Sequence, residues 1–396
     1  MALYTSDRFA SASATGTDWR DTSRAVLELL EKAAIPGHDY RIGFLYISDE
    51  LVEDAASILN LFRAVTNIEH WVGATGLGVC ATNAEYVESP AIAAMIGRMK
   101  DSDFCVFPAL KQGTTTEKLE KWTDHHDPML VLVHGDPQPD TDPATALETL
   151  EFITQGFITG GMSSSRSTTM QFADEISQGN ISGVAFSQDI DVATTLTQGC
   201  APIGTWHRIT RCEDNVIMEL DGQRVFEIFS SDLRDLAVSK GAAEENEDTD
   251  IQETLFRGEV HVAFPVQGSD QKDYLVRNIV GIDPEKGWIS VGHPVMNGEQ
   301  MMFVHRNNQT VRTDLSRALL EIRSRLETER GSFKPQGALY ISCMARAQPD
   351  FGVGPGGEMA LVREIIGDIP LAGFYANGEI SNRRFYGYTA ILILFL

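Results

Sequence analysis

The sequence predicts an α/β protein in which repeated strand-helix-strand units form mixed sheets covered by helices. Apolar runs of strand length alternate with segments whose apolar residues recur at helical spacing. The same order of strand, helix and glycine-ended strand occurs from residue 42, from residue 129 and from residue 337. The share of hydrophobic residues, 43%, is ordinary for a globular protein, so each part of this chain can bury a core.

The first unit opens with Ile42–Ser48, an apolar run of strand length. A helix is predicted next, because Leu51, Ile58 and Phe62 recur on one face. Trp71–Cys80 then forms a strand that enters the glycine-rich turn Gly73–Gly78. This turn lacks the lysine and serine of a phosphate-binding loop, so we expect it to join two strands.

The second unit repeats this order with a strand over Met129–His134, a helix over Pro143–Gln155 and a glycine-ended strand over Phe157–Gly161. The serines and Arg166 that follow are compatible with anion binding by backbone N–H groups or with a plain flexible loop. The third unit comprises the strand Gly337–Cys343, a short helix pattern, the block Pro370–Ile380 and a strand-like end over Tyr386–Leu396.

A composition shift divides the chain. Five acidic residues lie among small and polar ones between residues 237 and 252, where too little apolar surface exists to order the segment. We therefore predict a domain over residues 1–236, an acidic loop or linker over 237–252 and a domain over 253–396.

The net charge of −24 argues against binding to nucleic acid or anionic lipid. The first twenty residues lack the pattern of a secretory signal, and no apolar run approaches the roughly 20 residues that span a bilayer. The five cysteines are scattered without CxxC spacing, which favours reduced thiols over disulfides or a zinc site. We expect a cytoplasmic protein that does not enter a membrane.

The combination of blocks resembles the FIST sensory domain family over nearly the whole chain. The matching blocks are Ile42–Ser48 with Trp71–Cys80, Tyr274–Arg277 with Ile279–Gly281, Cys343 with Arg346, Pro370–Ile380 and Gly387–Thr389. Residues 1–236 then correspond to a FIST N-like half and 253–396 to a FIST C-like half. Ala345 and Ala347 flank Arg346 where the family often has glycine, which narrows access to the backbone there.

This resemblance implies a small-ligand sensor whose ligand is an amino acid or related metabolite. Such a sensor would signal through a separate histidine kinase or cyclic-di-GMP enzyme, because the chain carries no kinase or cyclase signature. Some relatives bind haem and sense nitric oxide, so a haem-based nitric oxide sensor is the alternative. Its axial ligand would come from among His70, His134, His207, His261, His293 and His305.

The candidate ligand-binding residues concentrate in the third unit. Arg346 follows a buried strand and is suited to bind a carboxylate, although an ion pair with Glu358 or Glu379 explains it equally. Glu379 would bind an amino group of the ligand, or would instead stabilise its own turn by accepting hydrogen bonds from backbone N–H groups. The full set is Arg346, Glu379, Asn377, Gly378, Cys343, Arg277 and Tyr388.

Two further functions stay open at this stage: an enzyme, and an interaction scaffold whose acidic segment Ala237–Asp250 contacts a basic partner. An enzyme using Glu379 and Cys343 is disfavoured, because no histidine lies near Cys343 to act as its base and no cofactor loop is recognisable. His125 and His126 lie between two aspartates, but adjacent side chains of an extended segment point in opposite directions. We therefore predict no catalytic residue and no metal ligand.

Overall fold

The computed structural model describes residues 3–110, 116–138, 142–239, 259–266, 274–347, 352–354 and 357–396. It has the mixed α/β class that the sequence predicts. The chain divides into two compact units: Met1–Thr197 with Leu315–Leu396, and Gln198–Asp314. Most of the predicted acidic linker, residues 240–252, lies outside the described residues, so that domain division stays a prediction.

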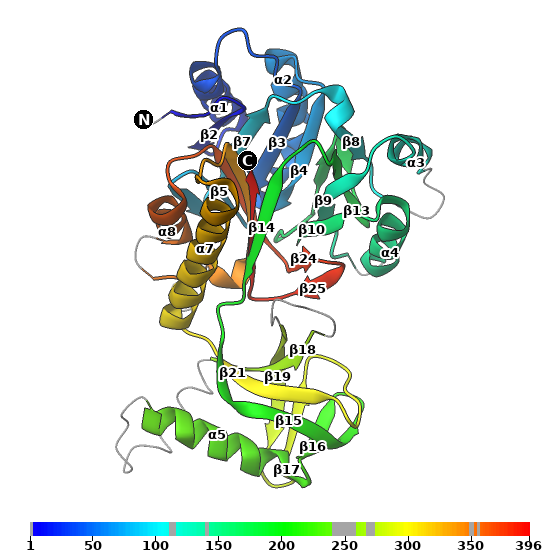
Figure 1. Cartoon of the computed structure of the whole chain (residues 1–396), viewed down its shortest axis with the longest axis vertical. Coiled ribbons are helices and arrows are strands. Elements are labelled where there is room, and N and C mark those ends of the chain that lie inside the picture. The colour runs from blue at the N-terminus through cyan, green and yellow to red at the C-terminus, as the bar shows by residue number, and fades with distance from the viewer. Residues whose placement is uncertain are drawn as a thin grey trace. The chain divides into compact units, whose positions relative to one another are not determined.

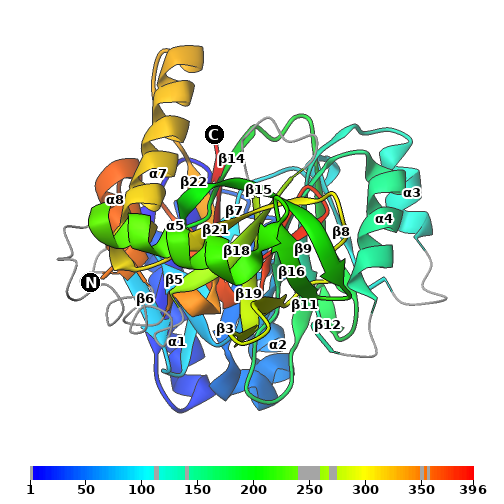
Figure 2. The ribbon, with the colours of Figure 1, turned by 90° about the horizontal axis from the view of Figure 1, so that it is seen from below.

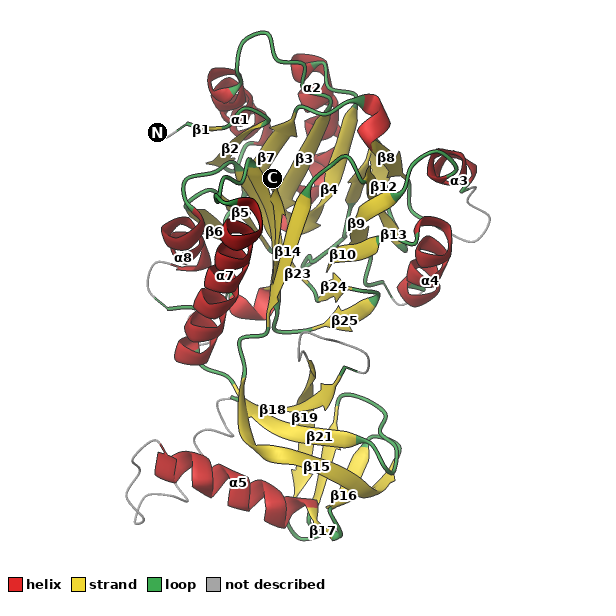
Figure 3. Ribbon diagram, viewed as in Figure 1, coloured by secondary structure: helices red, strands yellow, loops and turns green. Residues whose placement is uncertain are grey.

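The first unit contains three sheets, coloured as strands in Figure 3. Sheet 1 has the order β1 (Tyr4–Thr5), β2 (Phe9–Thr15), β7 (Ala91–Gly97), β3 (Ile42–Ser48), β4 (His70–Gly76), β11 (Gln171–Ala173), β12 (Glu175–Ser177). Sheet 2 has the order β25 (Arg384–Tyr386), β24 (Glu379–Ser381), β10 (Phe157–Met162), β9 (Pro128–Gly135), β13 (Ile181–Ser187), β8 (Phe104–Phe107). Sheet 3 has the order β14 (Val192–Thr197), β26 (Ala390–Phe395), β22 (Gly337–Cys343), β23 (Leu371–Ala376), β5 (Gly78–Ala81), β6 (Ala84–Val87).

Each sheet is built around one parallel pair, and these pairs are the strands of the three predicted units. β3 runs parallel to β4, β9 to β10 and β22 to β23. A helix connects the two strands of each pair: α2 (Ala55–Thr66), preceded by the 3₁₀ turn η1 (Asp49–Asp54), then α4 (Pro143–Thr154), and α8 (Gly357–Ile366) after η4 (Met344–Arg346). The internal repeat seen in the sequence is therefore a threefold structural repeat.

After its parallel pair, each repeat sends a hairpin into the sheet of another repeat. The β5–β6 hairpin pairs with β23 in sheet 3, β11–β12 pairs with β4 in sheet 1, and β24–β25 pairs with β10 in sheet 2. The chain then returns to its own sheet as β7, β13 or β26, each antiparallel to the first strand of its repeat. The three sheets are completed in this way by residues from distant parts of the sequence.

This exchange explains two differences from the predicted elements. The strand expected over Trp71–Cys80 is broken at Leu77, because β4 and β5 belong to different sheets. The strand expected over Tyr386–Leu396 is likewise split at residues 387–389 between β25 in sheet 2 and β26 in sheet 3. The apolar pattern continues across both breaks because β4, β5 and β26 are almost entirely buried and β25 ends in the buried Tyr386.

One apolar core is shared by all three sheets, and others lie beneath the helices. Phe44 of sheet 1, Phe186 of sheet 2 and Phe374 of sheet 3 belong to the same buried cluster. On the outer face of sheet 1, the helices α1 (Trp19–Ala33) and α2 cover a second cluster (Figure 1). The helices α3 (Glu117–Thr123) and α4 do the same for sheet 2. The 3₁₀ turn η2 (Asp101–Asp103) leads into β8.

Local sequence signals fix the helix ends. Asp18 caps α1 by accepting a hydrogen bond from Arg20 N at 2.8 Å, and Asp142 caps α4 from Thr145 N at 3.1 Å. Pro143 occupies the first turn of α4, where its missing N–H is not needed. α4 ends with Gln155 in the left-handed conformation, which satisfies the carbonyl of Glu151.

In the residues that the structure describes, the second unit is a closed antiparallel barrel with the helix α5 (Val225–Ser239) packed on it, visible from below in Figure 2. Its strand order is β15 (Ala201–Glu213), β21 (Gln300–His305), β18 (Val260–Pro265), β19 (Tyr274–Asp283), β20 (Trp288–Val291), β16 (Val216–Leu220), β17 (Gln223–Arg224). β15 also pairs with β16, which closes the barrel. Residues Val225 and Phe229 of α5 join its core. In sequence the barrel is an insertion between β14 and α7 (Asn308–Arg330).

Candidate functional site

The three loop motifs that the sequence analysis treated separately meet in the first unit, where β4, β10 and β23 end. Ser164 N donates to Thr75 O at 3.2 Å, and Ser164 Oγ donates to Tyr375 O at 2.5 Å. Met162 N donates to Gly378 O at 2.9 Å, and Asn377 N donates to Met162 O at 2.8 Å. The Gly73–Gly78 turn, the Gly160–Arg166 loop and Asn377–Gly378 therefore form one junction of the three sheets.

Small residues make this junction possible. A Cβ on Gly76 would lie 2.6 Å from Gly78 O, and a Cβ on Gly161 would lie 2.7 Å from the Ile341 side chain. Such distances are shorter than real Cβ contacts, so the glycines are needed for the close approach of the chains. The Gly73–Gly78 turn thus joins two strands, as the sequence predicts.

Most of the predicted ligand-binding residues surround the turn at residues 387–389, next to this junction. Arg346 NH1 donates to Tyr388 O at 3.3 Å, Thr389 N donates to Glu379 at 3.1 Å, and Cys343 N donates to Thr389 O at 2.9 Å. Tyr388 has a φ of 66°, a left-handed conformation that a tyrosine rarely adopts. Arg346 and Glu379 thereby bind the C=O and the N–H of the same peptide group, the one between Tyr388 and Thr389.

Arg346 also makes a buried ion pair with Glu358 at the start of α8. Arg346 Nε lies 2.6 Å and NH2 2.5 Å from Glu358 Oε1, and both side chains are at most 1% exposed. Tyr340 OH and Ser342 Oγ donate to the other oxygen of Glu358 at 3.1 and 2.7 Å. The ion pair that the sequence left open as an explanation for Arg346 is thus observed with Glu358.

A second carboxylate extends this network. Glu85 of β6 accepts hydrogen bonds from Met359 N at 2.6 Å and Tyr375 OH at 2.9 Å. Burial, followed by the negative charge of Glu358, raises the pKa of Glu85 above its usual value. Burial likewise raises the pKa of the Cys80 thiol well above the ordinary range, so this cysteine stays protonated. Sequence reasoning missed Glu85 because its partners lie more than 270 positions away.

The remaining predicted residues have different surroundings. Asn377 is exposed, whereas Glu379 and Cys343 are buried, and Gly378 has a φ of 102° that favours glycine. Arg277 belongs to the other compact unit, where its NH1 donates to Val276 O at 2.8 Å and burial lowers its pKa. The assignment of all seven residues to a ligand site stays a prediction.

A buried polar pair on the inner faces of the sheets joins His134, one of the possible haem ligands, to Tyr46, a partner that the sequence did not indicate. Tyr46 OH and His134 Nε2 lie 3.2 Å apart, and burial lowers the pKa of His134 to about 3. His134 and Glu379 are the register partners of Gly161 on either side of it in sheet 2. The signal for His134 was its place in the alternation Leu130, Leu132, His134, which puts it on the core-facing side of β9.

Arg166 is held by acidic groups of the first repeat. Its Nε and NH2 donate to Asp49 at 2.9 and 2.6 Å, and NH2 also donates to Glu50. These contacts lower the pKa of Asp49 against the opposing effect of burial. Arg166, which suggested an anion site in this loop, therefore pairs with two carboxylates of the protein itself.

Two of the histidines named as possible haem ligands, His134 and His207, have surroundings that oppose binding to an iron. His134 is enclosed in the shared core, and His207 has both ring nitrogens next to carboxylates, Asp221 at 2.7 Å and Asp232 at 3.2 Å. His70 Nδ1 lies 3.0 Å from Asp174, and His305 Nδ1 lies 3.2 Å from Ala201 O. His126 stacks on Trp122, and within the described ranges no three His, Cys, Asp or Glu side chains cluster as metal ligands would.

The comparison with known families decides the resemblance noted in the sequence. Residues 41–223 match the FIST N domain and residues 232–382 match the FIST C domain. The chain belongs to the FIST family. FIST domains are generally sensory domains that bind small ligands, so this FIST protein has a sensory, ligand-binding role in its coarse outline.

Its relatives add no finer assignment. An uncharacterized Mycobacterium tuberculosis protein is 27% identical over 95% of this chain and 97% of its own length. An uncharacterized Mycobacterium bovis protein is 32% identical over 65% of this chain and 62% of its own length. Among solved structures, T. maritima PurL complexed with FGAR covers 99% of this chain and 74% of its own, at 8% identity and a TM-score of 0.23. That score is too low to indicate a shared fold.

The comparisons and the fold bear on two other expectations. The FIST matches give no support to haem binding or nitric oxide sensing in this chain. Of the helices that the structure describes, none is long and apolar enough to cross a membrane.

Proposed function

We propose that this FIST protein is a cytoplasmic sensor for an amino acid or a related metabolite and that it signals through a separate partner. The partner would be a histidine kinase or a cyclic-di-GMP enzyme. In this proposal the ligand contacts Arg346, Asn377, Gly378, Glu379 and Tyr388, and Cys343 packs beside these residues.

One observation carries the proposal: a buried guanidinium and a buried carboxylate bind opposite ends of a single peptide group. Arg346 donates to the C=O of that group, and Glu379 accepts from its N–H. The carboxylate and the ammonium of an α-amino acid present an acceptor and a donor at a similar spacing, with the full charges that make such bonds stronger. A zwitterion could therefore replace the peptide group between Tyr388 and Thr389.

The exchange suggests how binding would be communicated. When the ligand takes these two contacts, the turn at residues 387–389 loses its anchors and the left-handed conformation of Tyr388 is no longer enforced. β25 and β26, which belong to different sheets, are joined by this turn. A ligand-dependent change of the turn would then act on two sheets together.

The test is thermal stabilisation by single amino acids, measured by scanning fluorimetry on the full chain. A ligand at 100 times its Kd adds about 2.7 kcal/mol of stability, which raises the melting temperature by several degrees. Glu379→Gln keeps the size of the side chain but removes the charge that would bind the ammonium group. We expect it to abolish the response.

Arg346→Ala is unsuitable here because it would leave Glu358 buried without its counter-charge. Arg346→Lys keeps the charge and removes the fork of N–H donors, so it should weaken the response while the protein stays folded. Glu364→Gln, on an exposed position of α8, is the control and should respond as the wild type does. The proposal is wrong if no amino acid stabilises the protein, or if Glu379→Gln responds normally.

A further inference from the structure

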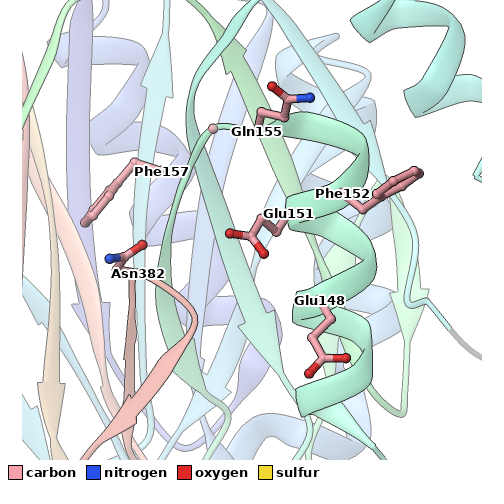
Figure 4. A pocket seen from close by; sticks show the side chains of 7 residues that line it. Glu148, Glu151, Phe152, Gln155, Phe157 and Asn382 are labelled. Carbon is pink, nitrogen blue, oxygen red and sulfur yellow. The ribbon is translucent and has the colours of Figure 1, made fainter. Parts of the chain in front are cut away.

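The surface of the second repeat is hollowed at one outer corner. There α4 ends beside the start of β10 and the turn of the β24–β25 hairpin, and a surface groove of about 730 Å³ opens between them. The groove is lined by Glu148, Glu151, Phe152, Gln155, Phe157 and Asn382 (Figure 4). In that view Glu151 extends toward the side on which Asn382 lies, while Phe152 projects away from it at the rim.

Phe152 is the feature that the repeat does not explain. Its side chain is 85% exposed, the most of any large apolar residue among those the structure describes. Counted back from the residue that caps each helix, the same position holds Ala64 in α2 and Glu364 in α8, both exposed. The fold therefore requires no aromatic ring here, and aromatic side chains are enriched in protein interfaces relative to the rest of the surface.

The groove also has a defined charge. Glu148 and Glu151 lie one helical turn apart on α4. Glu151 Oε2 lies 2.5 Å from NH1 of Arg383, which comes from the third repeat, so a guanidinium already occupies one of the two carboxylates. Glu148 forms no ion pair within the described part of the chain. In this groove the carboxylate of Glu151 is thus paired with a guanidinium, and the second carboxylate, Glu148, lies next to the exposed ring of Phe152.

We propose that this groove docks a protein partner that presents an arginine or lysine beside an apolar side chain. The cation pairs with Glu148 and the apolar side chain covers Phe152. The net charge of −24 favours a basic partner and opposes a second copy of this chain. This inference rests on the proposed signalling through a separate partner and names the surface that such a partner would contact.

The probe is a fluorescent helical peptide in which leucine and arginine recur at helical spacing, titrated against the full chain at physiological salt. Phe152→Ala and Glu148→Lys should each weaken its binding by about tenfold. The matched controls are Leu320→Ala, which removes another exposed apolar side chain, and Glu364→Lys, which reverses a charge at the corresponding corner of the third repeat. Each should change the affinity by less than about twofold, since neither borders the groove.

Arg383 supplies a second readout. Arg383→Ala frees Glu151 and should tighten peptide binding, whereas Arg363→Ala makes the same charge change beside Asp368 and should not. Equal effects of target and control variants would overturn the proposal, because binding would then follow net charge alone. A dimer in sedimentation that dissociates in Phe152→Ala would also overturn it, in favour of a second copy.

The two proposals fail separately. If Phe152→Ala binds the peptide as the control variants do and still responds to amino acids, only the docking site is contradicted. A wild-type chain that binds the peptide in the groove but responds to no amino acid would contradict only the proposed ligand.

Discussion

At the scale of single residues, the chain buries charge by surrounding each charged group with partners. Glu358 receives hydrogen bonds from Arg346, Tyr340 and Ser342, and Arg346 also reaches the Tyr388 carbonyl. A buried ion pair of this kind adds little net stability, but removing one partner costs about 3–5 kcal/mol because the other charge is left uncompensated. The network therefore fixes geometry around the 387–389 turn more than it stabilises the fold.

His134 gives a prediction at this scale. Its pKa is about 3 in the folded protein because the ring is fully buried, against about 6.5 for an exposed histidine. Below a pH of about 6.5 this histidine binds a proton in the unfolded chain but not in the folded chain. Protonation therefore favours the unfolded chain, and the free energy of unfolding decreases as the pH falls. Between pH 7 and pH 5 this loss should be about 2 kcal/mol.

Urea denaturation of wild type and His134→Gln at several pH values measures this contribution. The difference between the two free energies of unfolding should change with pH in the stated direction, independently of any constant cost of the substitution. Met129→Gln, at an exposed position without a titratable group, should leave the pH dependence of the wild type unchanged. Parallel pH profiles for wild type and His134→Gln would contradict the buried neutral state.

At the scale of elements, the three parallel pairs share one device. Gly73, Gly160 and Gly373 occupy equivalent positions, and a Cβ on each would lie 1.8, 1.9 and 1.8 Å from the carbonyl oxygen of its register partner, Leu45, Val133 or Tyr340. Glycine at these positions lets the second strand of each pair approach the first unusually closely. The recurrence of this contact in three repeats shows that it belongs to the repeat itself.

Replacing any one of these glycines by alanine should therefore destabilise the protein strongly, because backbone must move to make room. We expect a loss of at least about 3 kcal/mol in each variant, measured by chemical denaturation. Gly387→Ala is the control, since no other atom lies within 4 Å of the added Cβ. A loss as small as that of the control at all three positions would show that the strands are not so close.

At the scale of the whole molecule, the order of the sequence is not the order of the fold. The first compact unit takes its strands from both ends of the chain, and the barrel of residues 198–314 is inserted between β14 and α7, ahead of the third repeat. Gln198 N donates to Asp314 at 2.7 Å, so the chain enters and leaves the barrel at neighbouring points. The two FIST segments, 41–223 and 232–382, therefore do not coincide with the two compact units.

A fragment of residues 1–236 should consequently not fold as an independent domain. It would lack β22, β23 and β26, the central strands of sheet 3, and it would leave the inner face of the shared core exposed. Circular dichroism and thermal unfolding of this fragment should show no cooperative transition, in contrast to the full chain. A cooperatively folded fragment would mean that sheets 1 and 2 are stable without the third repeat.

The sequence by itself determined the α/β class, the FIST family, the three strand-helix-strand repeats and the importance of the glycine turns and of the C-terminal block. These features are visible because strand and helix periodicities and turn residues act over a few neighbouring positions. It also placed Arg346 and Glu379 among the residues to consider, from their positions after a buried strand and after Asn377–Gly378.

Only the tertiary structure decided how the repeats exchange hairpins, which acid pairs with Arg346, and what surrounds Glu85, His134 and Phe152. Each of these depends on pairing between segments tens to hundreds of positions apart, for which local periodicity carries no signal. Register across β10 and β24 brings Glu379 to Gly161, and the hairpin of the first repeat brings Glu85 to Tyr375. The physical reason is that the sequence states which side chain stands at each position, whereas strand pairing across the whole fold decides which other side chains it meets.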